Sequence, residues 1–200
     1  MKKQLGVAVI VCLFLMIAPV NAQQVDVAFA GGTLMSSGVS FNSLGLVASE
    51  HGGTYVGFNG DALIKGHLGV QGEVNWRASQ GVYAGTFPYR PLFWDFNAIY
   101  ARRFSPHVGA EVLGGIGGTS IRFYQGAYNC DFYGNCTNYQ SSNHFMADVG
   151  AGVRLYVYHN FFVRPEARLY MIHNNVEFSS GFPVRVGASV GYTFGGGGSQ

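Results

Sequence analysis

The chain has 200 residues, with 12 Lys or Arg, 10 Asp or Glu and a formal charge of +2 at pH 7. This length corresponds to a single ordinary domain. A nucleic-acid-binding protein would need a clustered basic surface, so we expect no nucleic-acid partner. Charged residues make up only 11% of the chain, against roughly 25% in a typical soluble domain.

The first 22 residues have the pattern of a secretory signal peptide. Lys2 and Lys3 give a positive start, residues 5–20 are uncharged, and small residues precede Gln23. We therefore predict a signal peptide over 1–22. A membrane anchor is the alternative, but the apolar stretch is short and contains Pro19.

The rest of the chain alternates apolar and polar residues with a period of two. Successive side chains of a strand point to opposite faces, so this pattern predicts β-strands. In the clearest strand, Leu68, Val70, Val74 and Trp76 oppose Gln71, Glu73, Asn75 and Arg77. The expected strands, in chain order, are 24–34, 54–64, 68–77, 90–104, 108–123, 144–158, 161–173 and 184–194. A flexible tail is expected over 195–200.

The connections between these strands alternate between long and short. Long loops are expected at 35–53, 78–89, 124–143 and 174–183, and tight turns at 65–67, 105–107 and 159–160. Small outer-membrane barrels combine an even strand number with short periplasmic turns and longer extracellular loops. The sequence therefore predicts an all-β fold, an eight-stranded antiparallel up-and-down transmembrane β-barrel over 23–194, with both termini in the periplasm.

The apolar face of the strands is expected to face lipid. The opposite face is rich in glycine and small groups, which suits a narrow interior, although Phe93, Ile99 and Leu113 fall on it as well. A secreted lipocalin-like barrel that binds an apolar ligand is the alternative, and it would turn the apolar face inward. Aromatic girdles mark membrane interfaces. The residues predicted to form them are Trp76, Trp94, Phe96, Tyr100, Phe161, Tyr192 and Phe194.

The polar face would bring acidic and basic residues together in the lumen. Buried charges must be paired, and near balance between the two signs permits this. Glu111 with Arg154 and Asp148 with Arg168 are the expected pairs between neighbouring strands. The predicted lumen network is Asp26, Asp61, Glu73, Arg77, Asp95, Arg103, Glu111, Asp148, Arg154, Arg164, Glu166, Arg168 and Arg185.

The loop over 124–143 carries two cysteines and several aromatic residues. Cys130 and Cys136 lie too far apart, and have too few neighbouring ligands, for a zinc site. In an oxidising compartment they predict a local disulfide. The tyrosines and phenylalanines of this loop either pack around that disulfide or form a contact surface for a protein or a glycan.

Chemistry at the expected outer rim is the remaining possibility. Ser142, His144, His173 and Glu177 lie near that rim, but spacing alone places no nucleophile beside a base. We therefore expect no catalysis, no cofactor and no metal site.

The chain ends its last strand with Gly191-Tyr192-Thr193-Phe194. Together with the strand pattern and the loop asymmetry, this closing strand resembles the OmpA/OmpX-like family of porin-like outer-membrane β-barrels over 23–194. The resemblance implies the outer membrane of a Gram-negative bacterium, membrane lipid as surroundings, and recognition of the 184–194 strand by the barrel-assembly machinery. It also implies a structural or surface-interaction role, with a narrow solute pore as the alternative.

Overall fold

The computed structural model describes residues 24–36, 40–41, 46–47, 50–65, 67–134, 136–175, 177–178 and 180–195. The predicted signal peptide and the predicted tail beyond residue 195 lie outside these described residues. Within the described part of the chain, no helix is long and apolar enough to cross a membrane.

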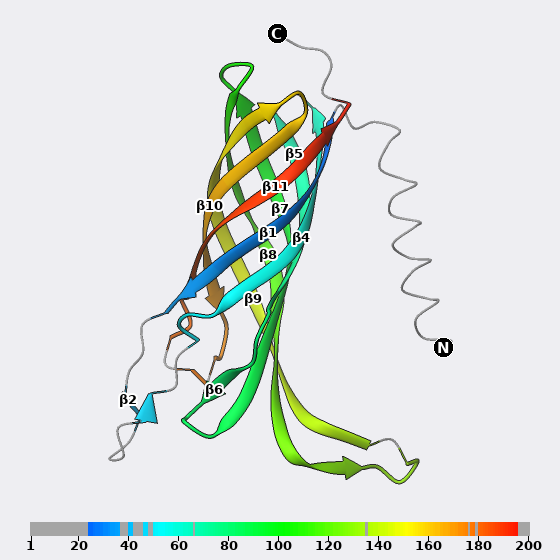
Figure 1. The fold of residues 1–200 in the computed structure, drawn as a ribbon, viewed down its shortest axis with the longest axis vertical. Coiled ribbons are helices and arrows are strands. Elements are labelled where there is room, and N and C mark those ends of the chain that lie inside the picture. The colour runs from blue at the N-terminus through cyan, green and yellow to red at the C-terminus, as the bar shows by residue number, and fades with distance from the viewer. Residues whose placement is uncertain are drawn as a thin grey trace.

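Eight long strands form one closed antiparallel barrel (Figure 1). They are β1 (Gln24–Met35), β4 (Thr54–Lys65), β5 (Leu68–Arg77), β7 (Phe87–Arg103), β8 (Val108–Cys130), β9 (Cys136–Tyr158), β10 (Phe161–Ile172) and β11 (Val184–Phe194). Each pairs with its neighbour in the chain, and β1 also pairs with β11, which closes the ring. The predicted all-β up-and-down fold is confirmed, and six strands match their predicted ranges within three residues at each end.

Three short strands lie in segments that were expected to be loops. β2 (Ser40–Phe41) pairs with β3 (Leu46–Val47), and β6 (Gly81–Tyr83) extends the sheet beside β7. We call the end of the barrel with His67 and the turns at 104–107 and 159–160 the short-turn end. The opposite end, where these short strands lie, is the long-loop end.

The largest departure from the predicted fold is an arm at the long-loop end. The range 124–143 was expected to be a loop, but the ladder between β8 and β9 continues through it to Cys130 opposite Cys136, with one register shift. Beyond Phe123, β8 no longer pairs with β7, so residues 124–134 and 136–139 form a ribbon two strands wide that bends away from the barrel (Figure 1). The prediction failed because a hairpin satisfies its own backbone hydrogen bonds even where the apolar alternation ends.

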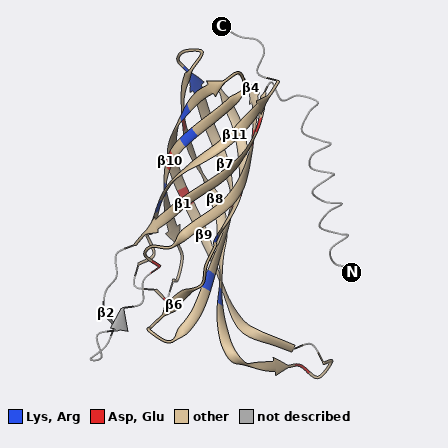
Figure 2. Cartoon of the chain, viewed as in Figure 1, with Lys and Arg blue, Asp and Glu red and all other residues tan. Residues whose placement is uncertain are grey.

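The barrel wall is apolar on the outside and polar on the inside. Along β7 the side chains alternate strictly between buried and exposed from Phe93 to Tyr100, and charged positions are sparse along the strands (Figure 2). Outward apolar side chains include Phe29, Phe58, Val112 and Val149, each about half exposed. This arrangement is the reverse of the lipocalin-like alternative, in which the apolar face would line a cavity.

Candidate functional site

The half of the lumen nearer the short-turn end is filled by two arginines. Arg154 pairs with Asp26, with Asp61 at 2.8 Å and with Glu111 at 2.5 Å, so the predicted contact between Glu111 and Arg154 is confirmed. Arg164 lies 2.9 Å from Asp61 and 2.9 Å from Glu111. These carboxylates come from β1, β4 and β8, so the two guanidinium groups link strands across the barrel.

Arg168 occupies the half nearer the long-loop end. It lies 2.6 Å from Glu73, 3.2 Å from Asp95 and 3.8 Å from Asp148. The predicted proximity of Asp148 and Arg168 is confirmed, although Glu73, on the far strand β5, is the nearer partner.

Glu166 connects the two halves of the lumen network. Its carboxylate lies 3.1 Å from Arg164 Nε and 2.6 Å from Arg185 Nη2. Arg185 also pairs with Glu73. All seven predicted lumen acids therefore face an arginine, and none is more than 7% exposed.

Two glycines of β9 make room for these arginines. A Cβ on Gly150 would lie 2.9 Å from Arg168 Cγ, and one on Gly152 would lie 3.2 Å from Arg164 Cγ. The glycine-rich polar face noted in the sequence thus provides the space through which the long side chains cross the lumen.

Apolar layers cover the charged network at both ends. These layers include Phe93, Ile99 and Leu113. The alternation had placed these apolar residues on the polar, inward face, and the layers explain why they lie there. Toward the long-loop end the layer is Leu34, Tyr55, Phe93, Met146, Tyr170 and Ile172. Toward the short-turn end the layers are Leu63, Ile99, Ala101 and Leu113, with Ala28, Tyr156 and Phe162. The lumen is therefore packed with side chains, as a barrel of eight strands allows.

Two predicted members of the lumen network are misplaced. Arg77 is half-buried at the long-loop end, where its Nη1 donates to Tyr89 Oη at 2.8 Å. Arg103 is exposed at the short-turn end and donates to the carbonyls of Ser105 and Pro106. The alternation gives the face of a residue but not its height, and both residues are the last of their strands.

The seven aromatic residues predicted for the girdles all lie on the outward face. Phe161, Tyr192 and Phe194 form a cluster at the short-turn end, with ring centroids 4.9 and 4.8 Å apart. Phe96 departs from the expectation, because it lies opposite Gly72 halfway along the ladder and so belongs to the centre of the apolar belt. The complete set is Trp76, Trp94, Phe96, Tyr100, Phe161, Tyr192 and Phe194, and its contact with membrane interfaces stays a prediction.

The tip of the arm combines a disulfide with exposed aromatic side chains. Cys130 and Cys136 are disulfide-bonded, as predicted. Tyr128, Phe132 and Tyr133 are 70%, 98% and 86% exposed, so they do not pack around the disulfide. Of the two interpretations of this segment, the exposed contact surface fits the arrangement.

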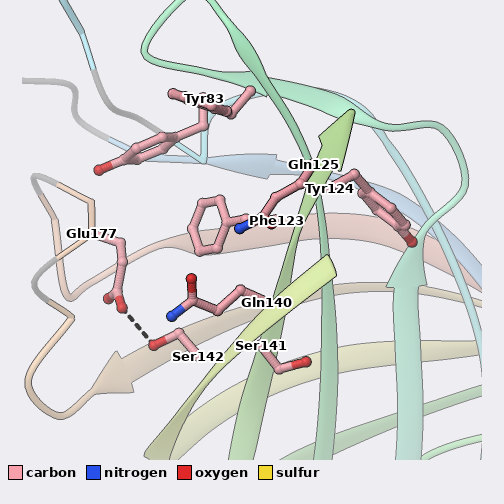
Figure 3. Close-up of a pocket in the computed structure, with 9 residues that line it drawn as sticks. Tyr83, Phe123, Tyr124, Gln125, Gln140, Ser141, Ser142 and Glu177 are labelled. Carbon is pink, nitrogen blue, oxygen red and sulfur yellow. Dashed lines mark hydrogen bonds between the residues drawn. The ribbon is translucent and has the colours of Figure 1, made fainter. Parts of the chain in front are cut away.

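A cleft of about 410 Å³ opens at the base of the arm (Figure 3). Its aromatic wall is held from behind by Phe178, whose ring lies 5.4 Å from that of Tyr83 and 6.5 Å from that of Phe123. The lining residues are Tyr83, Phe87, Phe123, Tyr124, Gln125, Gln140, Ser141, Ser142 and Glu177.

Three residues considered for catalysis meet at the edge of this cleft. Ser142 Oγ donates to Glu177 Oε1 at 2.5 Å and lies 3.0 Å from His144 Nε2. The same His144 nitrogen lies 2.9 Å from Glu177 Oε2. A nucleophile–base–acid relay needs the serine and the acid on opposite ring nitrogens. Here both contact Nε2, so the cluster fixes the Glu177 carboxylate instead of activating Ser142.

Glu50 is a buried acid at the same end of the barrel. It is fully buried, and neither of its oxygens has a hydrogen-bond partner among the described residues. Burial raises the pKa of Glu50 from its ordinary 4.5 to about 8, the nearby Arg77 lowers it, and Glu177 raises it further. Glu50 is therefore protonated over most of the physiological range.

No protein-family model and no curated protein matches the sequence. Solved structures do match it. Neisserial surface protein A is 17% identical, covers 86% of this chain and 96% of its own, and gives a TM-score of 0.60. The outer membrane protein OprG of Pseudomonas aeruginosa is 10% identical, with coverages of 87% and 97% and a TM-score of 0.54. Ail, the attachment invasion locus protein of Yersinia pestis, in complex with the heparin analogue sucrose octasulfate, is 14% identical, with coverages of 86% and 97% and a TM-score of 0.50.

This chain has the fold of the outer-membrane β-barrel proteins. The resemblance inferred from its strand pattern is thereby confirmed at the level of the fold, and identities this low carry nothing further.

Sequence reasoning missed several residues of the long-loop end of this barrel. Tyr83 and Glu50 lie in segments that were expected to be loops, and Gln140 lies at the base of the arm, opposite Phe123. The only available signal was the cluster of aromatic residues around position 124, because the segments that meet at the cleft are separated by up to about a hundred residues.

Proposed function

We propose that this chain is an integral outer-membrane β-barrel protein that acts by contact at its long-loop end, without catalysis. A signal peptide over 1–22, the barrel over 23–194 and a tail over 195–200 make up the chain. Both termini lie in the periplasm, so the arm projects outside the cell. The observation that carries this proposal is the contrast between a lumen filled with ion pairs and an arm that exposes aromatic side chains.

The outward apolar face supports placement in lipid. Bilayers accept only backbones whose polar groups are all paired, and a closed ring of strands meets this condition. The strand 184–194 ends in Tyr192 and Phe194 on the outward face, which supports its role as the segment read by the barrel-assembly machinery.

The arm supports a role in surface interaction. Residues 124–143 contain no Lys or Arg and a single acid, Asp131. Large exposed aromatic side chains supply contact area with little loss of conformational freedom, which suits a protein or glycan partner. Ail has been solved with a heparin analogue, but an arm with one acid and no base does not favour a sulfated ligand.

The proposal is tested by the position of the arm on cells. A peptide epitope inserted after Gly134, which is exposed and has a φ of 78°, should bind antibody on intact cells. The extracted protein should also migrate differently in SDS gels before and after boiling, as closed membrane barrels do. An epitope reached only after the envelope is permeabilised would refute the orientation, and recovery in the soluble periplasm would refute the membrane location.

The alternative function is a narrow solute pore. The filled lumen argues against it. The arginine network would have to rearrange to admit water, because its carboxylates and guanidinium groups are paired and buried. We expect no persistent conductance steps from the purified protein in planar bilayers. Stable open steps would favour the pore.

A further inference from the structure

The cleft at the base of the arm brings aromatic rings and planar polar groups together (Figure 3). We propose that it binds a neutral saccharide. This inference rests on the proposed exposure of the long-loop end and names the class of ligand that this end would contact. The volume of the cleft, about 410 Å³, falls within the roughly 300–1,000 Å³ that is usual for small-molecule binding sites.

The aromatic wall of the cleft suits the apolar face of a sugar ring. Tyr83 and Phe123 meet edge to face with centroids 5.1 Å apart, and Phe178 packs behind both. Tyr89 adds a fourth ring, 5.2 Å from Phe178. Because the rings hold one another, the C–H face of a pyranose would pack against a surface that is already in place.

The opposite side of the cleft carries planar polar groups. The amide of Gln140 points toward the space between Phe123 and Glu177 (Figure 3). An amide can donate and accept at once, and Glu177 Oε1 keeps a lone pair beyond the bond from Ser142, so these groups match the adjacent hydroxyls of a sugar. The Glu177 carboxylate is held by Ser142 at 2.5 Å and His144 at 2.9 Å, which fixes its direction before a ligand binds.

The charges around the cleft select against acidic sugars. No Lys or Arg lines it, and its one ionisable carboxylate is that of Glu177. Arg122, on the neighbouring part of β8, stacks over Tyr139 at 5.1 Å from the ring centroid. A sulfated or sialylated saccharide would meet an acid and no base within the cleft, whereas a neutral one would meet only matched groups.

The test uses the full barrel in phospholipid nanodiscs, applied to an array of saccharides. The array carries neutral oligosaccharides of host type, neutral core oligosaccharides of bacterial lipopolysaccharide, and sialylated and sulfated oligosaccharides. Binding to either neutral group supports the proposal, and the group that binds identifies the source of the ligand. Binding only to acidic saccharides, or to none, overturns it. Antibody binding to the epitope at Gly134 is measured separately, so a displayed barrel that binds no sugar refutes this inference and leaves the surface location intact.

Variants locate the binding to the cleft. Phe123→Ala and Gln140→Ala should each weaken binding of the selected neutral saccharide at least tenfold, and the shift in gel mobility before and after boiling verifies that each variant is folded. Gln140 is exposed, so its replacement should not disturb folding. Phe104→Ala is the matched control, because Phe104 is 64% exposed at the short-turn end, away from the cleft and the arm, and this variant should bind like the unaltered protein. Full binding by both cleft variants, or its loss in the short-turn variant alone, would overturn the assignment.

Discussion

Replacing Arg154 with Met should strongly destabilise the barrel. Removing one partner of a buried ion pair destabilises by about 3–5 kcal/mol, because the remaining charge is left unpaired. After the change, Asp61 and Glu111 would keep Arg164 at 2.9 Å each. Asp26 would keep no arginine, only the amide of Gln24 at 3.0 Å. The loss should therefore arise mainly from Asp26, which is 2% exposed.

This reasoning predicts a partial rescue. Adding Asp26→Asn to Arg154→Met removes the unpaired charge and should restore about half of the lost free energy of unfolding. The assay is urea unfolding in phospholipid vesicles, followed by the fluorescence of Trp76 and Trp94 and extrapolated linearly to zero urea.

Arg102→Met is the matched control for the loss of an arginine. Arg102 is exposed at the short-turn end, so its replacement should change the free energy of unfolding by no more than about 0.5 kcal/mol. The account of the lumen network is refuted if Arg154→Met is as mild as Arg102→Met. It is also refuted if Asp26→Asn restores nothing.

Three further changes test the long-loop end and the lumen. An unfolded chain releases the Glu50 proton near pH 4.5, whereas the folded protein holds it to about pH 8. The free energy of unfolding should therefore fall as pH rises through this window. At 1.36 kcal/mol per pH unit, the loss is at most roughly 5 kcal/mol. In Glu50→Gln, the urea midpoint measured from pH 5 to 8.5 should change less with pH. A midpoint that falls with pH as steeply as in the original protein would contradict the assignment. Gly152→Leu should destabilise by about 1–3 kcal/mol because the lumen is already filled at that point, whereas Gly126→Leu, with open space around it, should leave the urea midpoint unchanged. Replacing Cys130 and Cys136 with Ser should speed proteinase K cleavage of the arm. The free energy of unfolding of the barrel should change by no more than about 0.5 kcal/mol, since the disulfide lies beyond the barrel. A large drop in the urea midpoint would show that the arm stabilises the barrel.

Alternation along the chain was sufficient to place the strands of the barrel wall. The period of two is a local property, so Leu68 to Arg77 could be assigned both faces without knowledge of its neighbours. The same local rule failed at strand ends, where Arg77 and Arg103 share the lumen parity but leave the packed interior. It also failed in the arm, where Tyr, Ser and Asn residues form strands although one face is no longer buried against a core.

The sequence by itself determined the number of barrel strands, the direction of their apolar faces, the disulfide and the seven acids of the lumen. It did not determine the charge balance there, because Arg77 and Arg103 lie at the barrel ends and four arginines face the seven acids. Only the tertiary structure decided which charges meet. Arg154 reaches Asp26 across the barrel, 128 positions earlier in the chain, because the ring closes between β1 and β11 with a fixed stagger. The cleft depends on closure in the same way, because Tyr83, Gln140 and Glu177 come from separate segments that a single strand pattern cannot bring together.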